Sequence, residues 1–158
     1  MIRGIGAGII IAKPDEEYGF RFLVLKGRET GIWSFSKGHS ESIDAGSLLR
    51  TAARETYEET GLTAGEDYTI YGNSVRFGKR PYWLGILKPY ATDIALQDRE
   101  HSDYAWLPAT AIEFLRGNSD MRAWIQKSQR GEFQRLLAIS ASLTISNRRS
   151  NASDRIVS

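Results

Sequence analysis

Residues 47–61 are the stretch that most constrains the fold, because they read as one capped helix with an apolar stripe. Ser47 suits the N-cap position, and Gly61 suits the left-handed residue that often ends a helix. Apolar side chains recur between them at Leu48, Leu49, Ala52 and Ala53. This spacing predicts a helix over 47–60 that packs one side on a core.

The second half of this helix is crowded with carboxylates. Glu55 lies three residues before Glu58 and four before Glu59, and such spacings place side chains on one helical face. Like charges there destabilise an isolated helix, and Arg54 can offset only part of the repulsion. Two interpretations are open: a solvated acidic face, as most charge runs are, or a site for a divalent cation. Mg²⁺ prefers carboxylate and water oxygens and usually shares its ligand shell with phosphates.

The rest of the chain supplies strands and two further helices. Strands are expected over residues 7–12, 20–26, 31–36, 68–75, 82–87 and 104–107, and loops over 37–41 and 88–99. Helices are expected over 109–116 and, with Ser119 or Asp120 as cap, through the apolar positions up to Leu137. This order lacks a regular βαβ rhythm, so it predicts an α/β fold with a central mixed sheet and helices on both sides.

One domain over residues 1–139 is expected, followed by a flexible C-terminal tail over 140–158, where Ser, Asn and Arg dominate. The 21 basic and 19 acidic residues give a formal charge of +2, which makes no global case for nucleic-acid or membrane binding. The absence of cysteine excludes disulfides and thiolate metal sites. The apolar run near the N-terminus is too short to span a membrane, so a cytoplasmic protein is expected.

Gly38 followed by Arg54-Glu55-x-x-Glu58-Glu59-x-Gly61-Leu62 resembles the sequence box of the Nudix hydrolases. That box reads Gly, five residues, Glu, seven residues, Arg-Glu, an apolar residue, any residue, Glu-Glu, any residue, Gly, apolar. The lead-in Trp33-Ser34-Phe35-Ser36-Lys37-Gly38-His39 is also similar to the family, with Ser36 where Pro is common and Thr56 at an apolar slot. Tyr82-Trp83-Leu84 and Glu100-His101 resemble the branch that hydrolyses diadenosine tetraphosphate.

The resemblance implies a Nudix-like α/β/α sandwich and a pyrophosphohydrolase that cuts a phosphoanhydride bond with Mg²⁺, or with Mn²⁺ as a substitute. By this resemblance, Gly38, Glu55, Glu58 and Glu59 hold the metal. Either Glu55 or Glu58 activates the attacking water, and Arg54 fixes a carboxylate by a charge-assisted hydrogen bond. Glu100 lies in a loop that many members use for a further ligand or base; the alternative is an exposed loop acid.

The implied substrate is a small-molecule nucleotide polyphosphate, foremost diadenosine tetraphosphate. Lys37 and His39 would meet its phosphates, and a surface position is the alternative for His39. Lys79 and Arg80 would bind the polyphosphate or stand as solvated loop cations, and Tyr82 would stack on a base. Diphosphoinositol polyphosphates, nucleotide sugars and capped RNA ends are rival substrates. A capped end is the one nucleic-acid partner considered.

The first half of the box departs from the family pattern, because Gly38 and Arg54 are two residues further apart. Counting back from Arg54 places the expected Glu on Gly46, whereas counting forward from Gly38 places it on Asp44. A two-residue loop insertion with Asp44 as substitute predicts lowered activity. The alternative is a non-catalytic module that binds a nucleotide and regulates a partner.

Overall fold

A seven-stranded mixed sheet forms the centre of the protein in the computed structural model, which describes residues 5–127, 131 and 133–139. The strands are β1 (Gly6–Asp15), β2 (Gly19–Gly27), β3 (Trp33–Ser34), β4 (Ser36–His39), β5 (Tyr68–Phe77), β6 (Arg80–Leu87) and β7 (His101–Leu107). The helical elements are the short 3₁₀ helix η1 (Ser42–Asp44) and the α-helices α1 (Leu48–Thr60), α2 (Ala109–Ile112) and α3 (Ser119–Lys127). Residues 133–139 are also helical.

The strands follow the order β3-β2-β1-β6-β5, while β4 pairs with β1 and β7 pairs with β2. The β1–β6 pairing is parallel, with Gly8 opposite Tyr82, and the other pairings are antiparallel. The predicted mixed sheet is therefore confirmed.

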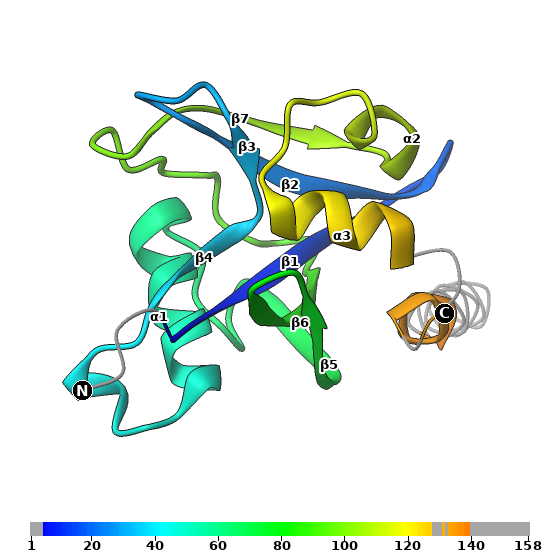
Figure 1. Ribbon diagram of the computed structural model, residues 1–158. Coiled ribbons are helices and arrows are strands. Elements are labelled where there is room, and N and C mark those ends of the chain that lie inside the picture. Colours follow the sequence, from blue (N-terminus) through cyan, green and yellow to red (C-terminus); the bar gives the residue numbers. More distant parts are fainter. Residues whose placement is uncertain (1–4, 128–130, 132, 140–158) are drawn as a thin grey trace, which may run out of the picture.

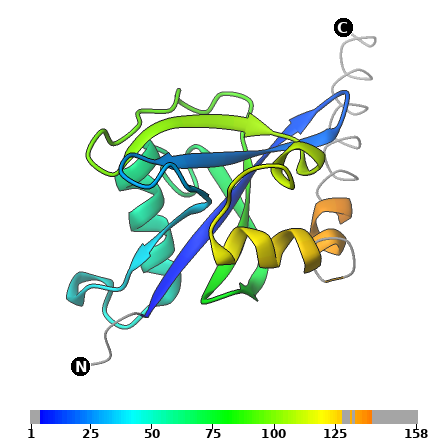
Figure 2. The same cartoon turned by 45° about the horizontal axis from the view of Figure 1, so that its top comes forward.

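Helices cover both faces of this sheet, with α1 on one side and α2 and α3 on the other (Figure 1). Alternation along β1 builds the two cores. Ile9 and Ile11 pack with Ala52 of α1, whereas Ile10 and Ala12 pack with Trp124 of α3. Figure 2 shows the same three layers after a turn of the molecule, with the helix of residues 133–139 beside the end of α3.

The helix that carries the carboxylates begins and ends as predicted. The Ser47 side chain accepts a hydrogen bond from the Arg50 backbone N–H (3.2 Å). Gly61 adopts a left-handed conformation (φ 78°), and its N–H donates to the Tyr57 carbonyl. The local signals for a cap at each end were sufficient to predict the bounds of α1.

Two expectations about neighbouring segments are wrong. Residues 37–39, expected in a loop, belong to β4, because the backbone of β1 pairs with them, with Ala7 opposite Gly38. The helix expected over 109–116 ends at Ile112. The segment after it is drawn into pairing with Trp33, whose N–H donates to the Arg116 carbonyl (2.9 Å) and whose carbonyl accepts from the Asn118 N–H (2.9 Å).

The expected tail over 140–158 lies outside the described residues, as do residues 128–130 and 132 of the predicted last helix. Among the residues that the structure describes, no helix is long and apolar enough to cross a membrane.

The core on the α3 side yields a stability prediction for Trp124, which is 1% exposed and meets Phe22, Phe35 and Phe133 edge-on. Trp124→Ala should lower the free energy of unfolding by about 3–5 kcal/mol, because the lost packing leaves a cavity. Urea denaturation measures this change. Phe114→Ala is the matched control: Phe114 is 84% exposed, so its loss should change stability by no more than about 0.5 kcal/mol. Equal effects of both substitutions would contradict the assigned core.

Candidate active site

Gly38 of β4 lies directly against the side chain of Glu55 on α1. A Cβ atom built at Gly38 would stand 2.0 Å from the Glu55 carboxyl carbon, so no larger residue fits without moving that carboxylate. The glycine therefore lets the helix bring Glu55 onto the β4 backbone. This contact joins the two halves of the predicted metal site.

The Arg54 guanidinium donates hydrogen bonds to two carboxylates of α1 and to the backbone of β4. Its Nη1 donates to Glu55 (3.1 Å) and to both carboxylate oxygens of Glu58 (3.1 Å each). Its Nη2 donates to the His39 carbonyl at the end of β4 (2.9 Å). One largely buried guanidinium thus connects α1 to β4 and holds the carboxylates of Glu55 and Glu58.

Asp44 holds the other edge of the same guanidinium. Its two oxygens accept from Arg54 Nε (2.9 Å) and Nη2 (3.0 Å), and one of them also accepts from Thr51 (2.8 Å). The side chain is 2% exposed, and the Arg54 hydrogen bonds hold the pKa of Asp44 well below its usual range. The forward count from Gly38 thus matches the structure, whereas Gly46 lies in the turn that follows, with φ at 79°.

Glu59 lies one turn after Glu55 on the same face of α1 and is 1% exposed. One of its oxygens accepts from the Lys37 backbone N–H (2.9 Å), and the other lies 3.2 Å from His101 Nε2. Burial raises the pKa of Glu59 to about 8, and the charges of Glu55 and Glu100 act in the same direction.

Ser36 and Thr56, the two residues that depart from the family pattern near the helix, contact one another behind Glu59. The Ser36 hydroxyl is 2.9 Å from the Thr56 hydroxyl and 3.4 Å from the Glu59 carboxylate. Both side chains are buried, so each polar group supplies the partner that the other needs. The two residues that differ from the family pattern are therefore in direct contact with one another.

Glu100 completes the acidic cluster from the loop before β7. Ligand atoms of Glu59, Glu100 and His101 all lie within 4.8 Å of one another. The loop is fixed beside α1 by backbone bonds from Ala95 to Thr60 (2.8 Å) and from Gln97 to Glu59 (3.0 Å).

Arg28, to which no motif in the sequence pointed, lies just after β2 and holds the same loop. Its backbone N–H donates to the Glu100 carbonyl (2.8 Å), and its side chain donates to the Asp98 carbonyl. His101 is buried beside Glu59, with its Nε2 3.2 Å from that carboxylate.

Glu55 lies against Gly38, and Glu58, Glu59 and Glu100 are close enough for the charges of these carboxylates to oppose one another. Burial raises the pKa of Glu55, and the charges of Glu58 and Glu100 raise it further, against the opposing effect of Arg54. Carboxylate oxygens are among the ligands that Mg²⁺ prefers, and water and phosphate oxygens usually complete its shell. The residues present fit a divalent cation, which would relieve this repulsion.

The residues predicted to bind substrate divide into two groups. Lys37 and His39 lie on β4 beside the carboxylates, with His39 exposed. Lys79 is exposed in the turn between β5 and β6, while Arg80 is ion-paired with Asp120 at 2.9 Å. Tyr82 requires a correction: it is fully buried, with Phe35 and Phe77 against its ring, so it offers no free face to a base.

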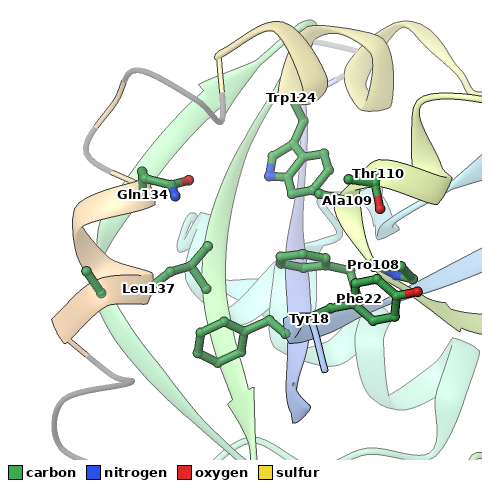
Figure 3. Close-up of a pocket in the computed structure, with 10 residues that line it drawn as sticks. Tyr18, Phe22, Pro108, Ala109, Thr110, Trp124, Gln134 and Leu137 are labelled. Atoms are coloured by element: carbon green, nitrogen blue, oxygen red, sulfur yellow. The ribbon is translucent and has the colours of Figure 1, made fainter. Parts of the chain in front are cut away.

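Two hollows in the described surface lie elsewhere. An apolar one of about 330 Å³ opens between β2, α2 and α3, with Trp124 between Leu137 on one side and Pro108 and Thr110 on the other (Figure 3). The second, of about 880 Å³, lies between the end of β1 and residues 88–94. None of the predicted site residues lines either hollow.

Comparison with known proteins places this geometry in a family. Residues 2–128 match the NUDIX domain family. The chain is 37% identical over 128 residues to the asymmetrical bis(5'-nucleosyl)-tetraphosphatase of Sus scrofa, covering 75% of this chain and 84% of that protein. It is 34% identical over 129 residues to the Rattus norvegicus protein of the same name, with the same coverage of each chain.

Solved structures agree on the fold. An Ap4A hydrolase binary complex from C. elegans superimposes with a TM-score of 0.64 at 24% identity, covering 78% of this chain and 93% of that one. The Nudix hydrolase RenU from M. smegmatis gives a TM-score of 0.63 at 18% identity, covering 80% and 84%. With the family match over most of the sequence and the carboxylates gathered at Gly38, the chain belongs to the Nudix hydrolase family.

Proposed function

We propose that this chain is a Mg²⁺-dependent hydrolase of a dinucleoside polyphosphate such as diadenosine tetraphosphate, which it cuts asymmetrically with water. The observation that carries the proposal is the set of carboxylates that Arg54 and Gly38 hold together at one end of α1. The substrate is supported by the mammalian relatives, whose name states asymmetrical bis(5'-nucleosyl)-tetraphosphatase activity.

Glu55, Glu58 and Glu59, with the Gly38 carbonyl, would hold the cation, and Glu100 stands close enough to Glu59 to join them. When bound, Mg²⁺ neutralises phosphate charge and lowers the pKa of water. The protein itself supplies positioning and charge, which account for most of the catalysis in phosphoryl transfer.

Glu55 or Glu58 orients the attacking water and accepts its proton. The water oxygen forms a new bond to phosphorus, the bridging P–O bond breaks, and its electron pair leaves with the departing phosphate. Diadenosine tetraphosphate and one water thereby give ATP and AMP. Glu58 is half exposed and Glu55 largely covered, so both stand at the boundary between solvent and the buried Glu59.

Asp44 supports an active enzyme over a binding-only module. The shorter side chain still reaches Arg54 with both oxygens, because the backbone reverses through two left-handed residues, Ala45 (φ 51°) and Gly46 (φ 79°). The turn at Ala45 and Gly46 thus brings the Asp44 carboxylate up to the guanidinium. Despite the departure from the family spacing, Arg54 bonds both Glu55 and Glu58.

The first prediction here concerns Glu58. Glu58→Gln should lower kcat on diadenosine tetraphosphate by at least about 100-fold, because a carboxamide neither accepts the proton nor binds the cation as a carboxylate does. Chromatography of the products measures it, and the parent should release ATP and AMP only when Mg²⁺ is present. Glu113→Gln, an exposed change just after α2, is the control and should keep the parent rate. A parent that binds the substrate without cutting it, with Mg²⁺ or Mn²⁺, would refute the hydrolase and leave the nucleotide-binding module.

The second prediction concerns the Asp44 loop. Asp44→Asn should lower activity about 10–100-fold, because Arg54 loses the partner that orients it toward Glu55 and Glu58. Asp44→Glu alone should also be impaired, since the extra methylene pushes the guanidinium away. Asp44→Glu combined with deletion of Ala45 and Gly46 restores the family spacing and should recover most of the parent kcat.

The deletion with Asp44 retained is the matched control, and it should be as impaired as Asp44→Glu. Two changes that are each harmful and together harmless would show that side-chain length and loop length are coupled. If the combined variant instead lost as much activity as the two single changes together, side-chain length and loop length would not compensate for one another.

A further inference from the structure

Two glycines of β1 leave room for the side chains of Arg80 and Tyr82 on the α3 side of the sheet. A Cβ atom at Gly8 would stand 2.4 Å from the Tyr82 ring. A Cβ atom at Gly6 would stand 2.5 Å from the Gly38 carbonyl oxygen and 3.1 Å from Arg80 Nε. Arg80 therefore reaches the sheet surface beside Gly38, the residue whose other side receives Glu55.

Asp120, in the first turn of α3, anchors this corner. Its carboxylate accepts from the Lys79 backbone N–H (2.8 Å), from Arg80 Nη1 (2.9 Å) and from the Tyr82 hydroxyl (2.6 Å). Asp120 is 1% exposed. Burial alone raises the pKa of Asp120, but the hydrogen bonds from Lys79, Tyr82 and Arg80 outweigh it and lower the pKa below its usual value.

Arg80 retains donors that no described residue uses. A guanidinium carries five N–H groups, and among the described residues Arg80 donates to Asp120 and interacts with the Tyr82 hydroxyl. Its Nε is buried without a hydrogen-bond partner, and its side chain is 16% exposed. A buried donor left unpaired destabilises the fold, and a guanidinium is suited to phosphate oxygens. If Arg80 served only to tie α3 to the sheet, nothing would require these spare donors to lie beside Gly38.

We propose that Arg80 binds a phosphate oxygen of the polyphosphate substrate and that Asp120 is the positioning residue that orients it. This inference rests on the proposed function. Gly38 contacts Glu55 on one side and lies beside Arg80 on the other, so a polyphosphate held at the carboxylates extends over β4 toward the guanidinium. The exposed Lys79 adds a second positive charge at the same corner.

The test pairs two variants that each remove one interaction with the same carboxylate. Asp120→Asn weakens the hold on Arg80, whereas Tyr82→Phe removes a bond to the same Asp120 oxygen and leaves the Arg80 pair in place. On diadenosine tetraphosphate with Mg²⁺, Asp120→Asn should raise KM about 10-fold with little change in kcat. Tyr82→Phe should lower the thermal unfolding midpoint and leave KM unchanged.

Arg80→Gln and Arg80→Lys test the guanidinium itself. Arg80→Gln should raise KM about 10- to 100-fold, the effect of losing a charge-assisted hydrogen bond, and Arg80→Lys should fall between it and the parent. Calorimetric binding of a methylene-bridged, uncleavable analogue of diadenosine tetraphosphate in EDTA gives a readout that needs no metal, and there the variants should follow the same order.

The inference is overturned if Asp120→Asn and both Arg80 variants lose stability yet keep the parent KM and the parent affinity in EDTA. A parent that binds the analogue through Arg80 but cuts nothing would refute the hydrolase and leave the Arg80 subsite standing.

Discussion

The Arg54 guanidinium is the interaction on which the rest of the site depends. It joins Asp44 at the end of η1, the end of β4 at the His39 carbonyl, and Glu55 and Glu58 on α1. Without the positive charge of Arg54, the carboxylates of Asp44, Glu55 and Glu58 would repel one another, and the His39 carbonyl would lose the hydrogen bond that it accepts from Arg54. Since a buried charge needs partners on every side, the geometry of this one residue fixes the distances among the carboxylates. Arg54 thereby offsets the charges of Glu55 and Glu58, while Glu59 and Glu100 lie beyond its hydrogen bonds, where a cation would bind.

Close backbone approach is the second constraint. Gly38 leaves room for Glu55, Gly6 for Arg80, and Gly8 for the Tyr82 ring. Small residues on the adjacent strands β1 and β4 therefore let functional side chains approach the backbone from both faces of the sheet. The pairing of Ser36 with Thr56 shows a related coupling, because each is a departure from the family pattern that makes a buried partner for the other. Asp44 and its left-handed turn form a further such pair. The chain thus keeps the family's fold while several of its residues depart from the family pattern together.

Local signals in the sequence predicted much of this arrangement. Caps and spacing gave the bounds of α1, and the spacing of Glu55, Glu58 and Glu59 predicted a shared patch, because both depend on residues within one or two helical turns. The two counts for the first box glutamate could not be separated in advance, since only the turn at Ala45 and Gly46 reveals that Asp44 reaches Arg54.

Contacts between distant segments escaped prediction. The apolar spacing of β6 indicates which residues share a face, but it does not show that Phe35 and Phe77 close over Tyr82. The roles of Arg28 and Asp120 likewise come from contacts between residues that lie tens of positions apart in the sequence.

The most direct measurement of the central claim is a crystal structure with Mn²⁺ and an uncleavable dinucleoside polyphosphate, in which anomalous scattering locates the metal. We expect a metal peak bonded to carboxylates of Glu55, Glu58 or Glu59 and to phosphate oxygens, with Arg54 still on Asp44. A peak elsewhere, or phosphates bound away from these side chains with no metal between them, would contradict it.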